Sequence, residues 1–189
     1  MMAWNEGGWL EGASWLASSN HGERPAGAEV SLVVIHNISL PPDEFGGDWV
    51  EDFFLNRLDA AVHPYFSTIS GLQVSAHFYV RRDGRIVQFV SCDRRAWHAG
   101  QSIWRGRENC NDYSVGIELE GSDFQPYAPA QYEALWTLLD ALRQRYPIAA
   151  ILGHCHVAPG RKTDPGPHFD WAALRARYGE LDLPTEVTG

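Results

Sequence analysis

Eight histidines supply this chain of 189 residues with imidazoles that could bind a metal ion or transfer protons. Two of them follow directly on apolar runs that have the composition of buried strands. His36 follows the run at 30–35, and His154 follows the run at 148–152 and Gly153. Ligands bind beyond the strand ends of open α/β sheets. The sequence therefore predicts that these two imidazoles converge on one site.

The segment at 153–166, GHCHVAPGRKTDPG, concentrates further reactive side chains around His154. Three interpretations fit its spacing. His154 and His156 could bind one metal ion from a single strand face, or His154 and Asp164 could do so across the loop. Cys155 could instead be a nucleophile with a histidine as its base, but no thiolate-stabilising setting such as a helix N-terminus is evident. Two imidazoles and one carboxylate, with a fourth position left to water, are typical of hydrolytic zinc sites.

A metal hydrolase also needs a base for the attacking water and a cation for the developing oxyanion. Glu118 and Glu120 lie in the GIELEG sequence after a β-rich run, where strand alternation places both on one face. Lys162, the only lysine of the chain, stands two residues before Asp164. The alternative for all three side chains is an ordinary solvated charge.

The remaining histidines divide by their surroundings. His77 lies inside the SAHFYV run, where a histidine of the core or of a sheet face is expected. His63 and His98 lie in irregular segments that are suited to lining a cleft.

Long apolar patterns predict the elements that must position these groups. Buried strands are expected at 30–36, 113–119 and 148–152, because their β-branched runs are too continuous for one solvated face. Amphipathic spacing predicts a helix at 49–58 and another from Pro129 to the stop at Pro147. A last helix is expected at 170–178, capped by Asp170.

A hairpin is predicted at 75–90, with its turn at Asp83 and Gly84. This dipeptide suits the positive φ angles of a two-residue turn. The arginines that border the turn, at 81, 82 and 85, are expected to lie in solvent. A hairpin combined with strand–helix–strand units predicts an α/β fold with a mixed central sheet flanked by helices.

Composition limits the partners and the compartment. A net charge of −9 argues against nucleic-acid and anionic-membrane partners, since phosphates would repel the chain. The longest aliphatic run has four residues, at 32–35, whereas a membrane-spanning helix needs about 20. The start of the chain lacks the basic and apolar regions of a secretory signal, and three widely spaced cysteines argue against a disulfide framework. A cytoplasmic location is therefore expected.

Six sequence blocks together resemble the zinc-dependent N-acetylmuramoyl-L-alanine amidase type 2 family. The resemblance covers about residues 30–175 and is greatest to the cytoplasmic 1,6-anhydro-N-acetylmuramoyl-L-alanine amidases of peptidoglycan recycling. The blocks are VVIHNISLPPDEFGG (33–47), HPYF (63–66), VSAHFYVRRDG (74–84), RAWHAG (95–100), GRENCNDYSVGIELEG (106–121) and GHCHVAPGRKTDPGPHFDW (153–171). The family's fold is a mixed central sheet flanked by helices in a single domain, with a zinc cleft at one face.

The resemblance implies one zinc ion per chain, held by His36, His154 and Asp164. It also implies Glu118 as the base for the attacking water and Lys162 as the stabiliser of the oxyanion. The implied substrate is the lactyl–L-Ala amide of 1,6-anhydro-N-acetylmuramic acid peptides. His156 then has no role in the site.

Substrate contacts are predicted from the blocks that surround the metal site. A muropeptide carries carboxylates, which arginine binds in a bidentate manner, and a sugar face that aromatic rings can cover. The candidate contacts are Asn37, Tyr65, Trp97, His98, Arg107 and Arg161.

The expected organisation is one catalytic domain with short flanking segments. Residues 1–26 should pack on the core, residues 27–180 should form the zinc amidase domain, and residues 181–189 should form a C-terminal tail. The protein is expected to act as a monomer on a small substrate.

Three other functions are compatible with parts of this pattern. A non-catalytic peptidoglycan-binding module would need only the cleft of the same fold. A periplasmic amidase would act on intact cell wall. A cysteine hydrolase would depend on Cys155, so that changing it to Ser would abolish only this activity.

Overall fold

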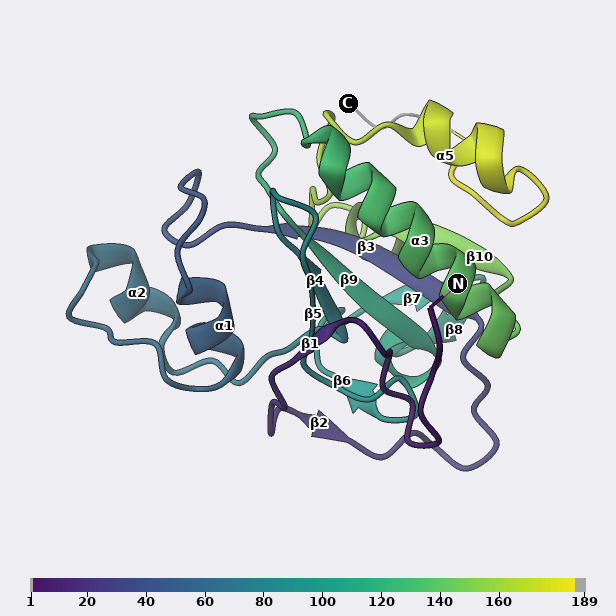
Figure 1. The fold of residues 1–189 in the computed structure, drawn as a ribbon, viewed down its shortest axis with the longest axis horizontal. Helices are drawn as coiled ribbons and strands as arrows, with labels where there is room; N and C mark the ends of the chain where they lie inside the picture. Colours follow the sequence, from purple (N-terminus) through teal and green to yellow (C-terminus); the bar gives the residue numbers. More distant parts are fainter. Residues whose placement is uncertain (1, 186–189) are drawn as a thin grey trace.

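Six strands form the central sheet of the computed structural model, which describes residues 2–185 (Figure 1). Their order across the sheet is β1-β5-β4-β9-β3-β10, and β4 and β5 are the only antiparallel neighbours among these described strands. The strands are β1 (Ser14–Trp15), β3 (Leu32–Ile38), β4 (Phe78–Val80), β5 (Ile86–Gln88), β9 (Ser114–Glu120) and β10 (Ala150–Gly153). The mixed sheet predicted from the sequence is therefore confirmed.

Short strands and helices surround this sheet. Two small antiparallel sheets pair β2 (His21–Gly22) with β6 (Arg95–Ala96) and β7 (Ile103–Trp104) with β8 (Arg107–Glu108). The helices are α1 (Trp49–Phe54), α2 (Pro64–Ile69), the 3-10 helix η1 (Cys110–Asp112), α3 (Pro129–Arg145), α4 (His154–Val157) and α5 (Trp171–Tyr178).

Strands β9, β3 and β10 form a parallel block that ends at one edge of the sheet. Their apolar runs are long because helices or loops cover both faces, so that neither face needs polar residues. Alternate residues of β3 and β9, including Val33, Ile35 and Ile117, pack with α3 and α5 in the largest apolar cluster. Figure 1 shows α3 and α5 on the same side of the sheet, well away from α1 and α2.

The predicted hairpin is present, but its turn differs from the prediction. Strands β4 and β5 pair in antiparallel fashion, with Tyr79 opposite Val87. The amide of Gly84 donates to the carbonyl of Arg81, and the amide of Arg81 donates to the carbonyl of Arg85. Gly84 alone in this loop has a positive φ, 85°. The prediction of a two-residue turn with two positive φ angles is therefore wrong, because three residues (82–84) form the loop.

The prediction that Arg81 lies in solvent is also wrong, because this residue is buried. Its side chain is 6% exposed and donates to the carboxylates of Asp48 and Glu51 and to two carbonyls at 46 and 47. The guanidinium thus connects the hairpin to the start of α1. A buried cation needs such partners, and here they come from another element.

Most other differences between the predicted and the observed elements concern short helices. The helix predicted at 49–58 ends at Phe54, and the segment after β10 contains the short α4. Helix α2 was not predicted; it begins after His63, whose Nδ1 accepts from the amide of Tyr65. The predicted helix α5 is confirmed with its cap, because Asp170 accepts from the amide of Ala173.

The N-terminal segment contributes to the same core. Leu10 is fully buried, and the indole of Trp4 donates to the carbonyl of Ala141 in α3. Arg24 donates to four main-chain carbonyls, at 92, 111, 112 and 114. Of the predicted C-terminal tail, residues 186–189 lie outside the described residues. Within the described part of the chain, the helices are too short or too polar to cross a membrane.

Candidate metal centre and catalytic cleft

Three side chains from two distant parts of the chain meet at the end of β10, beside the last residues of β3. His36 lies in β3, His154 begins α4 directly after β10, and Asp164 follows in the connecting loop. The Nδ1 atoms of the two histidines and Oδ2 of Asp164 form a triangle in which each separation is 3.0 Å. Among the described residues, this is the group of His, Cys, Asp and Glu side chains that could hold a metal ion.

The chemistry of this donor set fits a metal ion of the zinc type. Both histidines are buried, at 1% and 3% exposure. Burial and the neighbouring His154 lower the pKa of His36 to about 4, which keeps its imidazole neutral and able to bind a metal. Burial alone would raise the pKa of Asp164, but hydrogen bonds with His154 and His36 bring it below the ordinary value. Two imidazoles and one carboxylate thus gather their ligand atoms at one point, as in hydrolytic zinc sites.

The Nε2 atoms of both imidazoles also have hydrogen-bond partners. Nε2 of His36 lies 2.9 Å from Nδ1 of His98, and Nε2 of His154 lies 3.0 Å from the carbonyl oxygen of Ala99. These contacts leave the Nδ1 atoms directed at the centre of the triangle. Outer hydrogen bonds of this kind orient the histidine ligands of metal sites.

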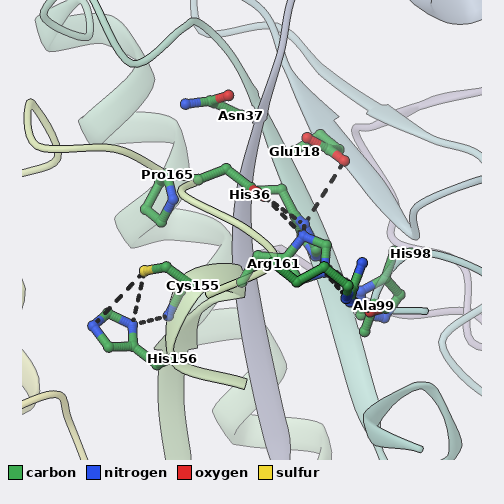
Figure 2. Close-up of polar contacts among 12 residues, drawn as sticks. His36, Asn37, His98, Ala99, Glu118, Cys155, His156, Arg161 and Pro165 are labelled. Atoms are coloured by element: carbon green, nitrogen blue, oxygen red, sulfur yellow. Dashed lines mark hydrogen bonds and ion pairs between the residues drawn. The ribbon is translucent and has the colours of Figure 1, made fainter. Parts of the chain in front are cut away.

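Glu118 provides an unpaired carboxylate oxygen beside the triangle. It stands opposite His36 in the β3–β9 register, with Oε1 4.0 Å from Nδ1 of His36 (Figure 2). Its Oε2 is buried and has no hydrogen-bond partner among the described residues. Burial, with the charge of Asp164, raises the pKa of Glu118 well above its usual value, while the charge of Lys162 opposes this shift. Such a carboxylate is suited to accepting a proton.

Glu120 lies on the same face of β9 but has a different environment. One of its carboxylate oxygens accepts from the amide of Gly46 and the other from the amide of Arg82. The predicted arrangement of the two glutamates on one face is correct. Glu120, however, joins two loops, and Glu118 alone has an oxygen left for chemistry.

A cleft of about 440 Å³ opens over this centre. Its lining includes the three metal-ligand candidates, Glu118, the exposed Lys162 and four of the predicted substrate contacts. Those four are Asn37, Tyr65, Trp97 and His98.

The other two predicted contacts lie elsewhere. The guanidinium of Arg107 lies 3.7 Å from the ring centre of Tyr113, and Arg161 donates to the carbonyls of Ala99 and Gln101. Arg161 lines a second pocket, of about 580 Å³, next to its own loop. Neither arginine lines the cleft in this structure.

Asp123 and Phe124 are among the cleft residues that were not predicted from the sequence. Asp123 accepts a hydrogen bond of 2.8 Å from Nδ2 of Asn37 and thereby fixes that amide. The neighbouring Phe124 lines the cleft with 77% of its surface exposed. Their position just after the end of β9 was the available signal, since loops that follow parallel strands line such sites.

Cys155 and His156 point away from the centre (Figure 2). His156 accepts from the amide of Gly153 and packs edge-on against Trp171. The segment is helical here, so that His154 and His156 do not share a strand face, and the metal interpretation based on that pair is wrong. His77 is a buried core histidine, as predicted, whereas His63 caps α2.

Comparison with known proteins gives a consistent result. Residues 26–167 match the family described as N-acetylmuramoyl-L-alanine amidase. The 1,6-anhydro-N-acetylmuramyl-L-alanine amidase AmpD of Citrobacter freundii is 54% identical over 171 residues, which are 89% of this chain and 91% of that protein.

Solved structures show the same relationship. The crystal structure of a selenomethionine AmpD derivative superposes with a TM-score of 0.90 at 54% identity and covers 93% of this chain and 98% of its own. The Escherichia coli amidase AmiD, solved in complex with the substrate anhydro-N-acetylmuramic acid-L-Ala-D-γ-Glu-L-Lys, has a TM-score of 0.60 at 30% identity. That match covers 87% of this chain and 68% of AmiD.

Proposed function

The chain belongs to the N-acetylmuramoyl-L-alanine amidase family, and we propose from this premise a substrate and a set of catalytic residues. The protein is an amidase that cleaves the bond between the lactyl group of 1,6-anhydro-N-acetylmuramic acid and the L-Ala of the stem peptide. Its relatives carry the name of this activity, and AmiD was solved with an anhydro-muropeptide substrate. The triangle of ligand atoms next to the unpaired Glu118 oxygen is the observation that carries the assignment.

His36, His154 and Asp164 would hold one zinc ion in this proposal. When bound, zinc supplies Lewis-acid chemistry, which lowers the pKa of a water molecule and polarises the amide carbonyl. Both imidazoles are buried where they line the cleft.

Glu118 and Lys162 would carry out the proton transfer and the charge stabilisation. The raised pKa of Glu118 suits a base that takes a proton from the attacking water and returns it to the leaving nitrogen of L-Ala. The charge of Lys162 lowers the pKa of both Glu118 and His36, which supports its assignment as the cation that stabilises a carbonyl oxygen there.

The remaining predicted residues would contact the substrate. Asn37, fixed by Asp123, presents its amide at the cleft wall, and Tyr65, Trp97 and His98 contribute rings to the lining. Arg107 and Arg161 would bind stem-peptide carboxylates at its edge, a role that requires their side chains to turn from their present partners. The cytoplasmic location and the monomeric state remain predictions of the same proposal.

Hydrolysis of purified 1,6-anhydro-N-acetylmuramic acid tripeptide tests this function. We expect release of free tripeptide, loss of release after verified removal of zinc, and recovery when zinc alone is added back. Release at the full rate from verified zinc-free protein would overturn the mechanism.

Two variants and a second substrate separate the alternatives. Glu118→Gln should bind zinc and substrate without turnover, and Cys155→Ser should remain active. Binding of the muropeptide by the wild type without any release would identify a non-catalytic module, and loss of activity in Cys155→Ser would identify a thiol enzyme. Faster release from intact cell wall than from the anhydro-tripeptide would assign the enzyme to wall cleavage.

A further inference from the structure

His98 lies flat against the main chain of β9, next to His36 (Figure 2). A Cβ atom added at Gly116 would fall 2.4 Å from Cγ of His98 and 2.6 Å from its Nδ1. No side chain larger than hydrogen therefore fits below the ring. The main chain of the histidine is fixed as well, because the amides of His98 and Ala99 both donate to Oδ1 of Asn111.

Both ring nitrogens of His98 are engaged in hydrogen bonds. Nδ1 lies 2.9 Å from Nε2 of His36, and Nε2 lies 3.2 Å from Oγ of Ser114. The rings of His36 and His98 are nearly perpendicular, at 88°, with their centres 5.0 Å apart. This arrangement directs a nitrogen of one ring at a nitrogen of the other, so that one of the two must carry the proton.

The position of the ligand candidates around His36 determines which of the two facing nitrogens carries the proton. His36 presents Nδ1 to His154 and Asp164, so its proton must be on Nε2 when Nδ1 binds a metal. Nε2 of His36 then donates to Nδ1 of His98. Nδ1 of His98 carries no proton in that state, and its Nε2 donates to the hydroxyl oxygen of Ser114. The three groups form one chain of hydrogen bonds with a single direction.

We propose that His98 is a positioning residue, which holds His36 in the metal-binding tautomer through this chain of hydrogen bonds ending at Ser114. The inference rests on the metal site of the proposed function and assigns His98 a role besides lining the cleft. Ser114 and Gly116 take part in the same arrangement. The hydroxyl of Ser114 is the last acceptor of the chain of hydrogen bonds, and the missing side chain of Gly116 leaves room for the ring of His98. Partners that orient a metal-bound imidazole typically contribute a factor of about 10–100 in metal affinity or activity.

Zinc affinity, measured by competition with a chromophoric chelator, tests the proposal. We expect His98→Ala to bind zinc about 10–100-fold more weakly. His98→Asn, whose carbonyl oxygen can take the place of Nδ1 as acceptor, should recover most of the affinity. Ser114→Ala should show a smaller loss, and Gly116→Ala should weaken zinc binding by displacing the ring. Long-range ¹H–¹⁵N NMR of zinc-loaded wild type should find the proton of His36 on Nε2.

His63 provides a control, because it is a histidine that caps α2 through the amide of Tyr65 and has no hydrogen bond or ring contact with His98 or a ligand candidate among the described residues. His63→Ala should lower thermal stability and leave zinc affinity unchanged. Equal zinc affinity in His98→Ala and wild type, or equal losses in His98→Ala and His98→Asn, would overturn the positioning role. Failure of the wild type itself to bind zinc would instead contradict the proposed function.

Discussion

Opposite charges act on the carboxylate of Glu118 within the cleft. Burial and the charge of Asp164 raise the pKa of Glu118, and the charge of Lys162 lowers it. Lys162 is also the only lysine among fifteen basic residues of the chain. An ammonium is a compact charge on a flexible stem, whereas a guanidinium is planar and donates in a fixed fork, so the two are not equivalent here.

Lys162 variants should separate charge from shape. Lys162→Ala should lower kcat by about 10²–10³-fold with zinc still bound, as expected for the loss of an oxyanion stabiliser. Lys162→Arg keeps the charge but should remain well below wild type. Steady-state kinetics and a zinc assay of each variant provide the measurement. Wild-type rates in the Arg variant would mean that any cation suffices, and loss of zinc from the Ala variant would mean that the lysine is structural.

Glu118→Gln should stabilise the zinc-free protein at neutral pH. The folded-state pKa of Glu118 is raised above its unfolded value, so its favourable contribution exists below the unfolded pKa and is lost as the pH rises through the folded pKa. The melting temperature of the variant should therefore exceed that of wild type by a margin that widens from acid to neutral pH. Thermal unfolding of both metal-free proteins over that range measures it, and a margin independent of pH would contradict the assignment.

Strands and helices with long patterns could be predicted from the sequence, whereas the short helices α2 and α4 could not. The runs of β3, β9 and β10 and the apolar face of α3 show their periods without reference to other parts of the chain. Helices α2 and α4 have six and four residues, too few for a period to show. Arg81 was misjudged because its partners come from another element.

In the candidate site, too, some features could be predicted from local sequence and others depend on distant parts of the chain. His154 follows the end of β10 as predicted, whereas His36 lies within β3 and Asp164 lies in a later loop. The resemblance to a family selected among the possible spacings.

The contact of His98 with Gly116 and Ser114 depends on how the loop after β6 packs against β9, which no local pattern encodes. The fixed position of Asn37 against Asp123 depends in the same way on two strand ends that are distant in sequence.

The Arg81–Glu51 pair should be the main tether of α1 to the hairpin. Removing the arginine leaves Glu51 buried without its partner, and we expect Arg81→Leu to lower the free energy of unfolding by about 3–5 kcal/mol. The double variant Arg81→Leu, Glu51→Leu should recover most of this loss. Urea denaturation compares them, with exposed Arg85→Leu as the control that should change stability by less than about 0.5 kcal/mol. A single variant as stable as the control would show that the pair is not a tether.

The protein as a whole is negatively charged, and so is its substrate. A net charge of −9 offers no long-range attraction to a muropeptide, so binding must depend on local cations at the cleft. The N-terminal segment is tied to later parts of the chain, since β1 pairs with β5, β2 pairs with β6, and Arg24 donates to four carbonyls of other segments.

Parallel pairing of β3 with both β9 and β10 also sets the order in which the site can be assembled during synthesis. His36 and Asp164 are separated by 128 positions, and parallel strands cannot be joined by a local hairpin. A growing chain therefore presents His36 long before its partners exist, and the complete ligand set appears only after the whole central sheet has been translated. Metal binding can then stabilise the finished topology, but it cannot nucleate it.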